Sequence, residues 1–197
     1  MKLKIDKFSK HLIDFTTVDF EKSLLKKNTI LDIGCGEGEF IVKLASLYPK
    51  RQFIGVEIKY GRIIKCLKKA HVCKLDNLKF VLCDATLFTT KILHSKSINK
   101  VFINNPDPWP KEKHQKNRLV DLELLTGIYE KLKRRGSLVI KTDSSEYFKE
   151  IKRNILKTNF SIDKSQDRLD SSTSLTKFQK LYREANKKIY SIKVQKK

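Results

Sequence analysis

The chain has 197 residues, a length that suits one domain with a complete hydrophobic core. Its 43 Lys and Arg outnumber its 22 Asp and Glu and give a formal net charge of +21, which predicts a polyanionic partner, although a lysine-rich proteome is the plainer explanation. The periodic apolar segments argue against global disorder. The sequence shows no signal peptide, no long apolar run and no metal-ligand spacing among its four cysteines, so we expect no membrane partner, no metal and a cytoplasmic location.

The N-terminal residues 1–27 are polar with scattered aromatic side chains, and we expect them to form an arm before one domain over 28–197. In that domain short apolar runs, typical of buried strands, alternate with amphipathic helices. The expected strands are 29–33, 53–56, 78–83, 98–103 and 137–140, and the expected helices cover 40–47, 63–70 and 119–132. This alternation predicts an α/β fold with a mostly parallel sheet covered by helices on both faces. The pattern weakens after about residue 160, and the Ser-rich stretch 171–174 is expected to be a loop.

A glycine turn, Gly34-x-Gly36-x-Gly38, joins the first expected strand to the first expected helix. That position is typical of a nucleotide-binding loop. A dinucleotide fold would show G-x-G-x-x-G, whereas here the third glycine comes one residue early and the acidic Glu37 and Glu39 surround it. Two carboxylates suit a cationic ligand better than a pyrophosphate. The turn therefore favours S-adenosylmethionine, with a nicotinamide cofactor as the alternative.

Carboxylates stand at the ends of three successive strands. Glu57 is placed to accept hydrogen bonds from both ribose hydroxyls, and Asp84 to accept one from the adenine amine. Asp32 is placed to face the methionine ammonium, directly or through water. A solvated strand end explains any one of them, but the three together with the Gly34 turn favour S-adenosylmethionine.

A proline-rich turn follows the strand at 98–103. Its three prolines fix φ and remove amide donors, so the chain leaves the sheet in a stiff, non-helical turn. Asp107 and Trp109 therefore stand at the carboxyl end of a strand, where open α/β sheets bind ligands. The plainer alternatives are a turn cap for Asp107 and a core plug for Trp109. The cations that follow suit phosphate groups, and they are Lys111, Lys113, Lys116 and Arg118.

On these motifs the chain resembles the bacterial tRNA (guanine-N7)-methyltransferases over about residues 28–192. The motifs that carry the resemblance are 31–38, 55–57, 105–119, 141–143 and 176–179. The resemblance implies a Rossmann-like class I methyltransferase domain with a seven-stranded, mostly parallel sheet. It also implies transfer of a methyl group from S-adenosylmethionine to N7 of a tRNA guanosine, that of position 46 in the variable loop.

The resemblance assigns roles to matching positions. It implies cofactor-binding roles for Asp32, Gly34, Glu57, Asp84 and Asp107. It implies guanosine-binding roles for Lys111, Asp143, Thr176 and Gln179, and RNA-binding roles for Lys113, Lys116 and Arg118. The chain departs from the family pattern at Glu112 and Asn117, where a Lys or Arg is usual, and at Gln179, where a Glu is usual.

The chemistry of the acceptor agrees with this set of residues. Guanine N7 carries an in-plane lone pair and no proton, so its methylation needs no general base. The product ring is cationic, and a carboxylate stabilises that charge as it develops. We expect Asp107 to be this catalytic group. A different nitrogen acceptor and a non-catalytic RNA-binding scaffold of the same fold remain the alternatives, and the sequence leaves the oligomeric state open between monomer and homodimer.

Overall fold

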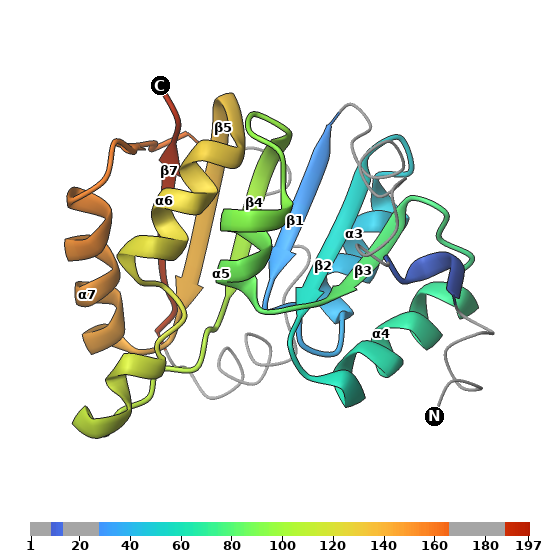
Figure 1. The fold of residues 1–197 in the computed structure, drawn as a ribbon, viewed down its shortest axis with the longest axis horizontal. Helices are drawn as coiled ribbons and strands as arrows, with labels where there is room; N and C mark the ends of the chain where they lie inside the picture. The colour runs from blue at the N-terminus through green and yellow to red at the C-terminus, as the bar shows by residue number, and fades with distance from the viewer. Residues whose placement is uncertain (1–8, 14–27, 166–187) are drawn as a thin grey trace.

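The computed structural model describes residues 9–13, 28–165 and 188–197 of the chain. Seven strands form one sheet in the order β3-β2-β1-β4-β5-β7-β6. Their bounds are β1 Thr29–Ile33, β2 Gln52–Glu57, β3 Leu78–Leu82, β4 Ile98–Asn104, β5 Leu132–Thr142, β6 Ser161–Ile162 and β7 Tyr190–Gln195. Among the strands of the described residues, only β7 runs antiparallel to its two neighbours (Figure 1). The predicted seven-stranded, mostly parallel α/β fold is therefore confirmed.

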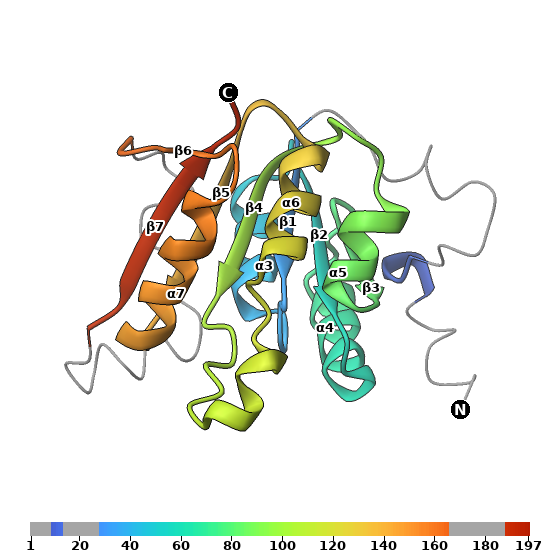
Figure 2. The ribbon, with the colours of Figure 1, turned by 60° about the vertical axis from the view of Figure 1, so that its left-hand side comes forward.

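Helices cover both faces of this sheet. The longer ones are α3 Glu39–Leu47, α4 Tyr60–Val72, α6 Leu122–Lys131 and α7 Ser145–Leu156. The short helical turns are η1 Ser9–His11, α5 Ala85–Leu87, η2 Phe88–Ile92 and η3 Glu112–Asn117. In Figures 1 and 2, α5 and α6 lie on one face of the sheet and α3 lies on the other. No helix in the described part of the chain is long and apolar enough to cross a membrane.

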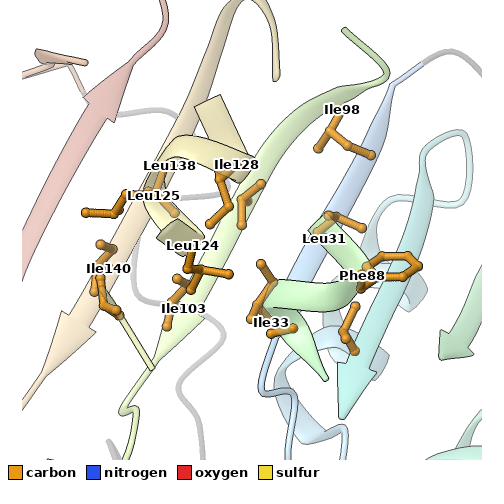
Figure 3. Close-up of a cluster of buried hydrophobic side chains, with 14 of the residues drawn as sticks. Leu31, Ile33, Phe88, Ile98, Ile103, Leu124, Leu125, Ile128, Leu138 and Ile140 are labelled. Carbon is orange, nitrogen blue, oxygen red and sulfur yellow. The ribbon is translucent and has the colours of Figure 1, made fainter. Parts of the chain in front are cut away.

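The hydrophobic core is divided by the sheet into two clusters, because successive strand residues point to opposite faces. In β1, Leu31 and Ile33 belong to the cluster under α5, α6 and α7, whereas Ile30 belongs to the cluster under α3 and α4. Figure 3 shows the first cluster, in which Leu124 and Ile128 of α6 lie over the sheet. Both faces are therefore buried, which explains the continuous apolar runs of the strands.

Helix α6 begins three residues later than the sequence pattern suggested. The side chain of Asp121 accepts a hydrogen bond of 2.8 Å from the amide of Leu124 and so caps the helix at its N-terminus. Leu119 and Val120 therefore belong to the connection from η3. Both ends of the fifth strand also extend beyond the predicted 137–140.

Five residues of the predicted N-terminal arm lie against the edge strand β3. The amide of Ile13 donates to the carbonyl of Phe80 at 2.8 Å, and Leu12 pairs with Phe80 in a parallel bridge. His11 is buried, and its Nδ1 lies 3.2 Å from the carbonyl oxygen of Leu78. This piece of the arm extends the sheet by one bridge. The predicted loop at 171–174 lies outside the described residues.

Candidate active site

A cavity of about 420 Å³ opens at the carboxyl ends of β1 to β4. The strand order reverses here, because β1 has β2 on one side and β4 on the other. Ligands bind at such a switch point in open α/β sheets. The residues of the lining that the sequence singled out are Gly34, Glu57, Asp84, Asp107, Trp109, Lys116, Asn117 and Arg118.

The glycine turn wraps tightly between β1 and α3. Gly34, Gly36 and Gly38 have φ values of 68°, 60° and 78°, a region that residues with a Cβ rarely adopt. A Cβ on Gly38 would also lie 2.9 Å from Sγ of Cys66, whereas one on Gly36 would meet nothing within 4 Å. The turn therefore requires glycine for its conformation, and at Gly38 for space as well.

Glu57 is held in a fixed orientation at the end of β2. It is buried, and its two carboxylate oxygens accept hydrogen bonds from the amides of Gly36, at 3.1 Å, and Lys59, at 2.9 Å. Arg62 Nη1 lies 3.6 Å from the oxygen that Gly36 contacts. Because an ionised carboxylate has about four acceptor sites, Glu57 retains capacity for further donors such as two adjacent hydroxyls.

Asp32 is buried one strand away and does not belong to the lining of the cavity. Asn104 ends β4, the strand beside β1, and its Nδ2 lies 3.4 Å from an oxygen of Asp32. Burial raises the pKa of Asp32 to about 7, the Asn104 hydrogen bond opposes this shift, and the nearby charge of Glu57 adds to it. This carboxyl group therefore favours a cationic partner, which would restore its ionised form.

Asp84 is exposed at the end of β3 and caps the next helical turn. Its Oδ1 accepts a hydrogen bond of 2.9 Å from the amide of Leu87. The side chain lines the cavity as well, so the cap and the predicted ligand contact are compatible.

The proline turn forms the other wall of the cavity. Asp107 is exposed on it, and Trp109 is only partly buried, its ring edge-on to His114 with centroids 5.8 Å apart. Both Asn105, at φ 49°, and Trp109, at φ 42°, adopt the left-handed region. Trp109 lines the cavity rather than filling the core.

Arg118 does not lie where a phosphate contact would place it. The sequence grouped it with the RNA-binding cations, but its side chain is only 3% exposed and forms ion pairs with Glu146 and Glu150 of α7. Its Nε donates to the carbonyl of Pro108 at 2.8 Å. Because its donors are used inside the protein, we remove Arg118 from the RNA-binding set.

The remaining predicted residues lie around the cavity or beyond the described chain. Lys111, Lys113 and Lys116 are exposed on and beside η3, and Lys116 lines the cavity. Asp143 is half-buried between β5 and α7 and is not part of the lining. Thr176 and Gln179 lie outside the described residues.

Two residues of the site were missed in the sequence. Arg62 stands in the first turn of α4, five residues after Glu57, a position that the sequence alone marks as close to that strand end. Asn104 was hidden because its contact with Asp32 depends on the order of strands in the sheet.

The hydrogen-bond acceptors in and beside this cavity fit S-adenosylmethionine. Carboxylates meet a glycine turn that exposes backbone, and one carboxyl group is buried beside it at a raised pKa. Ligand hydroxyls would use the free acceptor sites of Glu57, and a ligand cation would balance the charge of Asp32. In the ranges that the structure describes, no cluster of three or more His, Cys, Asp or Glu side chains is suited to a metal ion.

Solved structures share this fold at low sequence identity. The chain aligns with the 16S rRNA methyltransferase KamB at a TM-score of 0.67 and 13% identity, covering 92% of this chain and 94% of that one. It aligns with a 30S ribosomal A1408 methyltransferase from an uncultured bacterium at a TM-score of 0.62 and 20% identity, covering 94% and 95%. These likenesses establish the Rossmann-like methyltransferase fold.

Sequence relatives are closer. A tRNA (guanine-N(7)-)-methyltransferase from Buchnera aphidicola subsp. Schizaphis graminum is 39% identical over 135 residues, which are 68% of this chain but only 55% of that protein. Another such relative, from Buchnera aphidicola subsp. Baizongia pistaciae, is matched over 60% of its length. The chain thus spans somewhat more than half of these proteins.

A longer match comes from Buchnera aphidicola subsp. Acyrthosiphon pisum (strain APS). Its tRNA (guanine-N(7)-)-methyltransferase is 33% identical over 195 residues, 90% of this chain and 80% of that protein. The family model described as "Putative methyltransferase" matches residues 26–192. The motifs that suggested the resemblance lie within this match, and the chain belongs to the tRNA (guanine-N7)-methyltransferase family.

Proposed function

We propose that this protein transfers a methyl group from S-adenosylmethionine to N7 of a guanosine in tRNA, with guanosine 46 of the variable loop as the target. The observation that carries the proposal is the placement of Asp107. It stands on the rim of the cavity that the glycine turn and Glu57 also line. The match to tRNA (guanine-N(7)-)-methyltransferases over most of the chain supports the choice of acceptor.

The cofactor half of the cavity has a role for each carboxylate. In this proposal Glu57 accepts hydrogen bonds from the two ribose hydroxyls, Asp84 accepts one from the adenine amine, and Asp32 balances the methionine ammonium. Gly34 lets the backbone approach the ligand closely. When bound, S-adenosylmethionine supplies an electrophilic methyl group, and the protein's task is to hold it in line with the acceptor.

The acceptor half stabilises charge rather than moving a proton. Guanine N7 attacks with its own lone pair, and the purine becomes cationic during transfer. The carboxylate of Asp107 stabilises this developing charge. Lys111 and Asp143 orient the guanosine together with Thr176 and Gln179, and this set distinguishes guanine from adenine by leaving the wrong base unpaired.

The RNA backbone is bound by the exposed cations of η3 and its surroundings. Lys113 and Lys116 are the proposed phosphate contacts, with Lys111 beside them. N7 faces the deep, narrow groove of A-form RNA, so the target guanosine must come from an irregular region or turn out of its stack. A tRNA substrate makes the cytoplasm the expected location.

The proposal is tested with the purified chain, unmodified tRNA transcript and methyl-labelled S-adenosylmethionine, followed by digestion and identification of the labelled nucleoside. We expect 7-methylguanosine, and none from a transcript in which guanosine 46 is replaced by adenosine. Label from the replaced transcript would refute position 46 alone, and label in another nucleoside would refute the acceptor. Tight tRNA binding without any label would favour the non-catalytic scaffold.

A further inference from the structure

The turn that carries Asp107 has little support of its own. Pro106, Pro108 and Pro110 have no amide proton, so the turn cannot close by backbone hydrogen bonds at those positions. Trp109 is in the left-handed region at φ 42°, a conformation that costs about 1–3 kcal/mol and persists only where its surroundings hold it. Such a turn needs an external support to keep Asp107 in one place.

The side chain of Arg118 supplies that support by contacting backbone carbonyls of the turn. Its Nε donates to the carbonyl of Pro108 at 2.8 Å, and its Nη2 lies 3.5 Å from the carbonyl oxygen of Trp109. The two carbonyls stand on either side of the Cα of Trp109. The guanidinium therefore contacts the backbone at the strained residue itself.

The same guanidinium is anchored to α7. Nη2 lies 2.7 Å from a carboxylate oxygen of Glu146, and Nη1 pairs with Glu150 one helical turn further on. The ring of Tyr147 lies beneath the guanidinium, at 5.1 Å from its centroid to Cζ, and its hydroxyl accepts a hydrogen bond of 2.8 Å from the amide of Val120. Burial opposes the charge of Arg118, but the two glutamates more than offset it and raise its pKa above the ordinary value.

Asp143 stands just before Ser144, the N-cap residue of α7, so Arg118 joins two parts of the proposed acceptor site. It connects the turn that carries Asp107 to α7, the helix that follows Asp143 in the chain. We propose that Arg118 is a positioning residue that sets the placement of Asp107 relative to the acceptor, an inference that rests on the proposed methyl transfer. A misplacement of 1 Å in such a site can lower the rate by about 100-fold.

The first test uses Arg118→Lys, which keeps the charge but lacks the planar set of donors that reaches both the turn and α7. Trp109 is the only tryptophan of the chain, so its fluorescence reports on the turn without any assay of activity. We expect its emission to shift to longer wavelength and its quenching by acrylamide to increase, while the far-UV circular dichroism melting curve stays close to that of the wild type. The kcat for tRNA should fall about tenfold or more, with a much smaller change in KM.

Matched variants separate positioning from folding. Glu146→Gln weakens an anchor whose side chain is 62% exposed, so it should fold and show the same changes at smaller size. Glu123→Gln, an exposed carboxylate in the first turn of α6, is the control and should change neither the fluorescence nor kcat. Added guanidinium ion at non-denaturing concentration should restore turnover to Arg118→Ala, which a purely structural loss would not allow.

Each failure has its own meaning. Unchanged Trp109 fluorescence in folded Arg118→Lys would overturn the link between Arg118 and the turn. Shifted fluorescence with a normal kcat would show that the placement of the turn does not limit transfer, and would overturn the positioning role. Should Arg118→Lys not fold, normal kcat and fluorescence in Glu146→Gln would overturn it instead. Absence of transfer by the wild-type chain would refute the proposed function, while the fluorescence would still test the link.

Discussion

Asp107 differs from the other carboxylates of the cavity in its surroundings. Glu57 accepts hydrogen bonds from two backbone amides and Asp84 caps a helical turn, so both have structural partners. Asp107 forms no hydrogen bond or ion pair with any residue in the described ranges, and it is exposed at the cavity rim. A carboxylate that no described residue binds, two positions before the strained Trp109, agrees with the proposed role of Asp107 in methyl transfer.

Replacing Asp107 by Asn keeps its size and removes its charge. We expect methyl transfer to fall by about 100- to 1,000-fold, the range seen when one group that stabilises transition-state charge is removed. Single-turnover transfer at saturating S-adenosylmethionine measures this loss. Asp76→Asn, which changes an exposed carboxylate outside the cavity, is the control and should transfer normally. Near-normal turnover in Asp107→Asn would remove Asp107 from the mechanism.

Asp32 predicts how the affinity for S-adenosylmethionine depends on pH. Burial raises the pKa of Asp32 to about 7 in the free protein, so the group is protonated below that pH. Because a cationic ligand stabilises the ionised form, binding releases a proton, and the affinity should rise with pH from about 5.5 to 7. Calorimetry across this window should show the rise in the wild type and a flatter profile in Asp32→Asn. Equal profiles would exclude Asp32 as the partner of the cation.

The same shift has a consequence for stability. The folded pKa of Asp32, about 7, lies above the ordinary value of 3.8, so the unfolded state loses this proton first as pH rises. The wild type should therefore lose stability between about pH 4 and 7, by up to about 4 kcal/mol. Urea unfolding at pH 5 and pH 8 should show a larger drop in the wild type than in Asp32→Asn. A drop of the same size in both would contradict the assigned cause.

At the scale of elements, two glycines of the same turn allow the cost of backbone strain to be measured apart from the cost of steric crowding. Gly36 and Gly38 have similar positive φ values, but only a Cβ on Gly38 would meet a close neighbour, Sγ of Cys66 at 2.9 Å. Gly36→Ala should cost about 1–2 kcal/mol of unfolding free energy from its backbone conformation alone. Gly38→Ala should cost clearly more, because α4 must also shift. Urea denaturation measures both losses of unfolding free energy. Equal losses would show that α4 moves away from the added Cβ at no cost.

The elements also show what could be read from the sequence. The strands β1 to β4 and the turns that follow them were predictable, because each is a short apolar run ending in a glycine, an acidic residue or a proline. Strand β7 was not, since Tyr190–Gln195 acquires its place only by inserting between β5 and β6. Long-range pairing of this kind leaves no local signal beyond weak alternation.

Within the site, the residues that could be predicted are those marked by a local signal, such as a strand end followed by a turn. Asp107 and Glu57 were predicted from their positions at strand ends, and both line the cavity. Arg118 was misassigned, because a basic residue after a lysine-rich stretch looks like its neighbours until Glu146 and Glu150 of α7 are placed beside it. Asn104 was missed for the same reason, its partner lying on an adjacent strand 72 positions away in sequence.

For the molecule as a whole, the net charge of +21 raises the question of which basic surface binds tRNA. Lys111, Lys113 and Lys116 lie at the carboxyl edge of the sheet, beside the cavity. If each neutralises one phosphate, changing all three to Gln should make the logarithmic salt dependence of tRNA binding shallower by about 2 to 3. Binding titrations at several salt concentrations measure this slope.

The control for this prediction uses the opposite edge of the sheet. Lys50, Lys96 and Arg134 are exposed and stand near the amino ends of β2, β4 and β5. Changing these three to Gln lowers the net charge equally but should leave the slope close to that of the wild type. The same reduction in both triple variants would mean that the RNA responds to overall charge and not to the η3 surface.

The identity of the acceptor atom is the central claim of this account, and 7-deazaguanosine tests it most directly. A tRNA transcript made with this nucleoside keeps the shape and pairing of guanosine but has carbon in place of N7, so it has no lone pair to methylate. Transfer from labelled S-adenosylmethionine should occur with the guanosine transcript and be absent with the 7-deazaguanosine transcript. Equal transfer to both would place the methyl group on another atom and contradict the account.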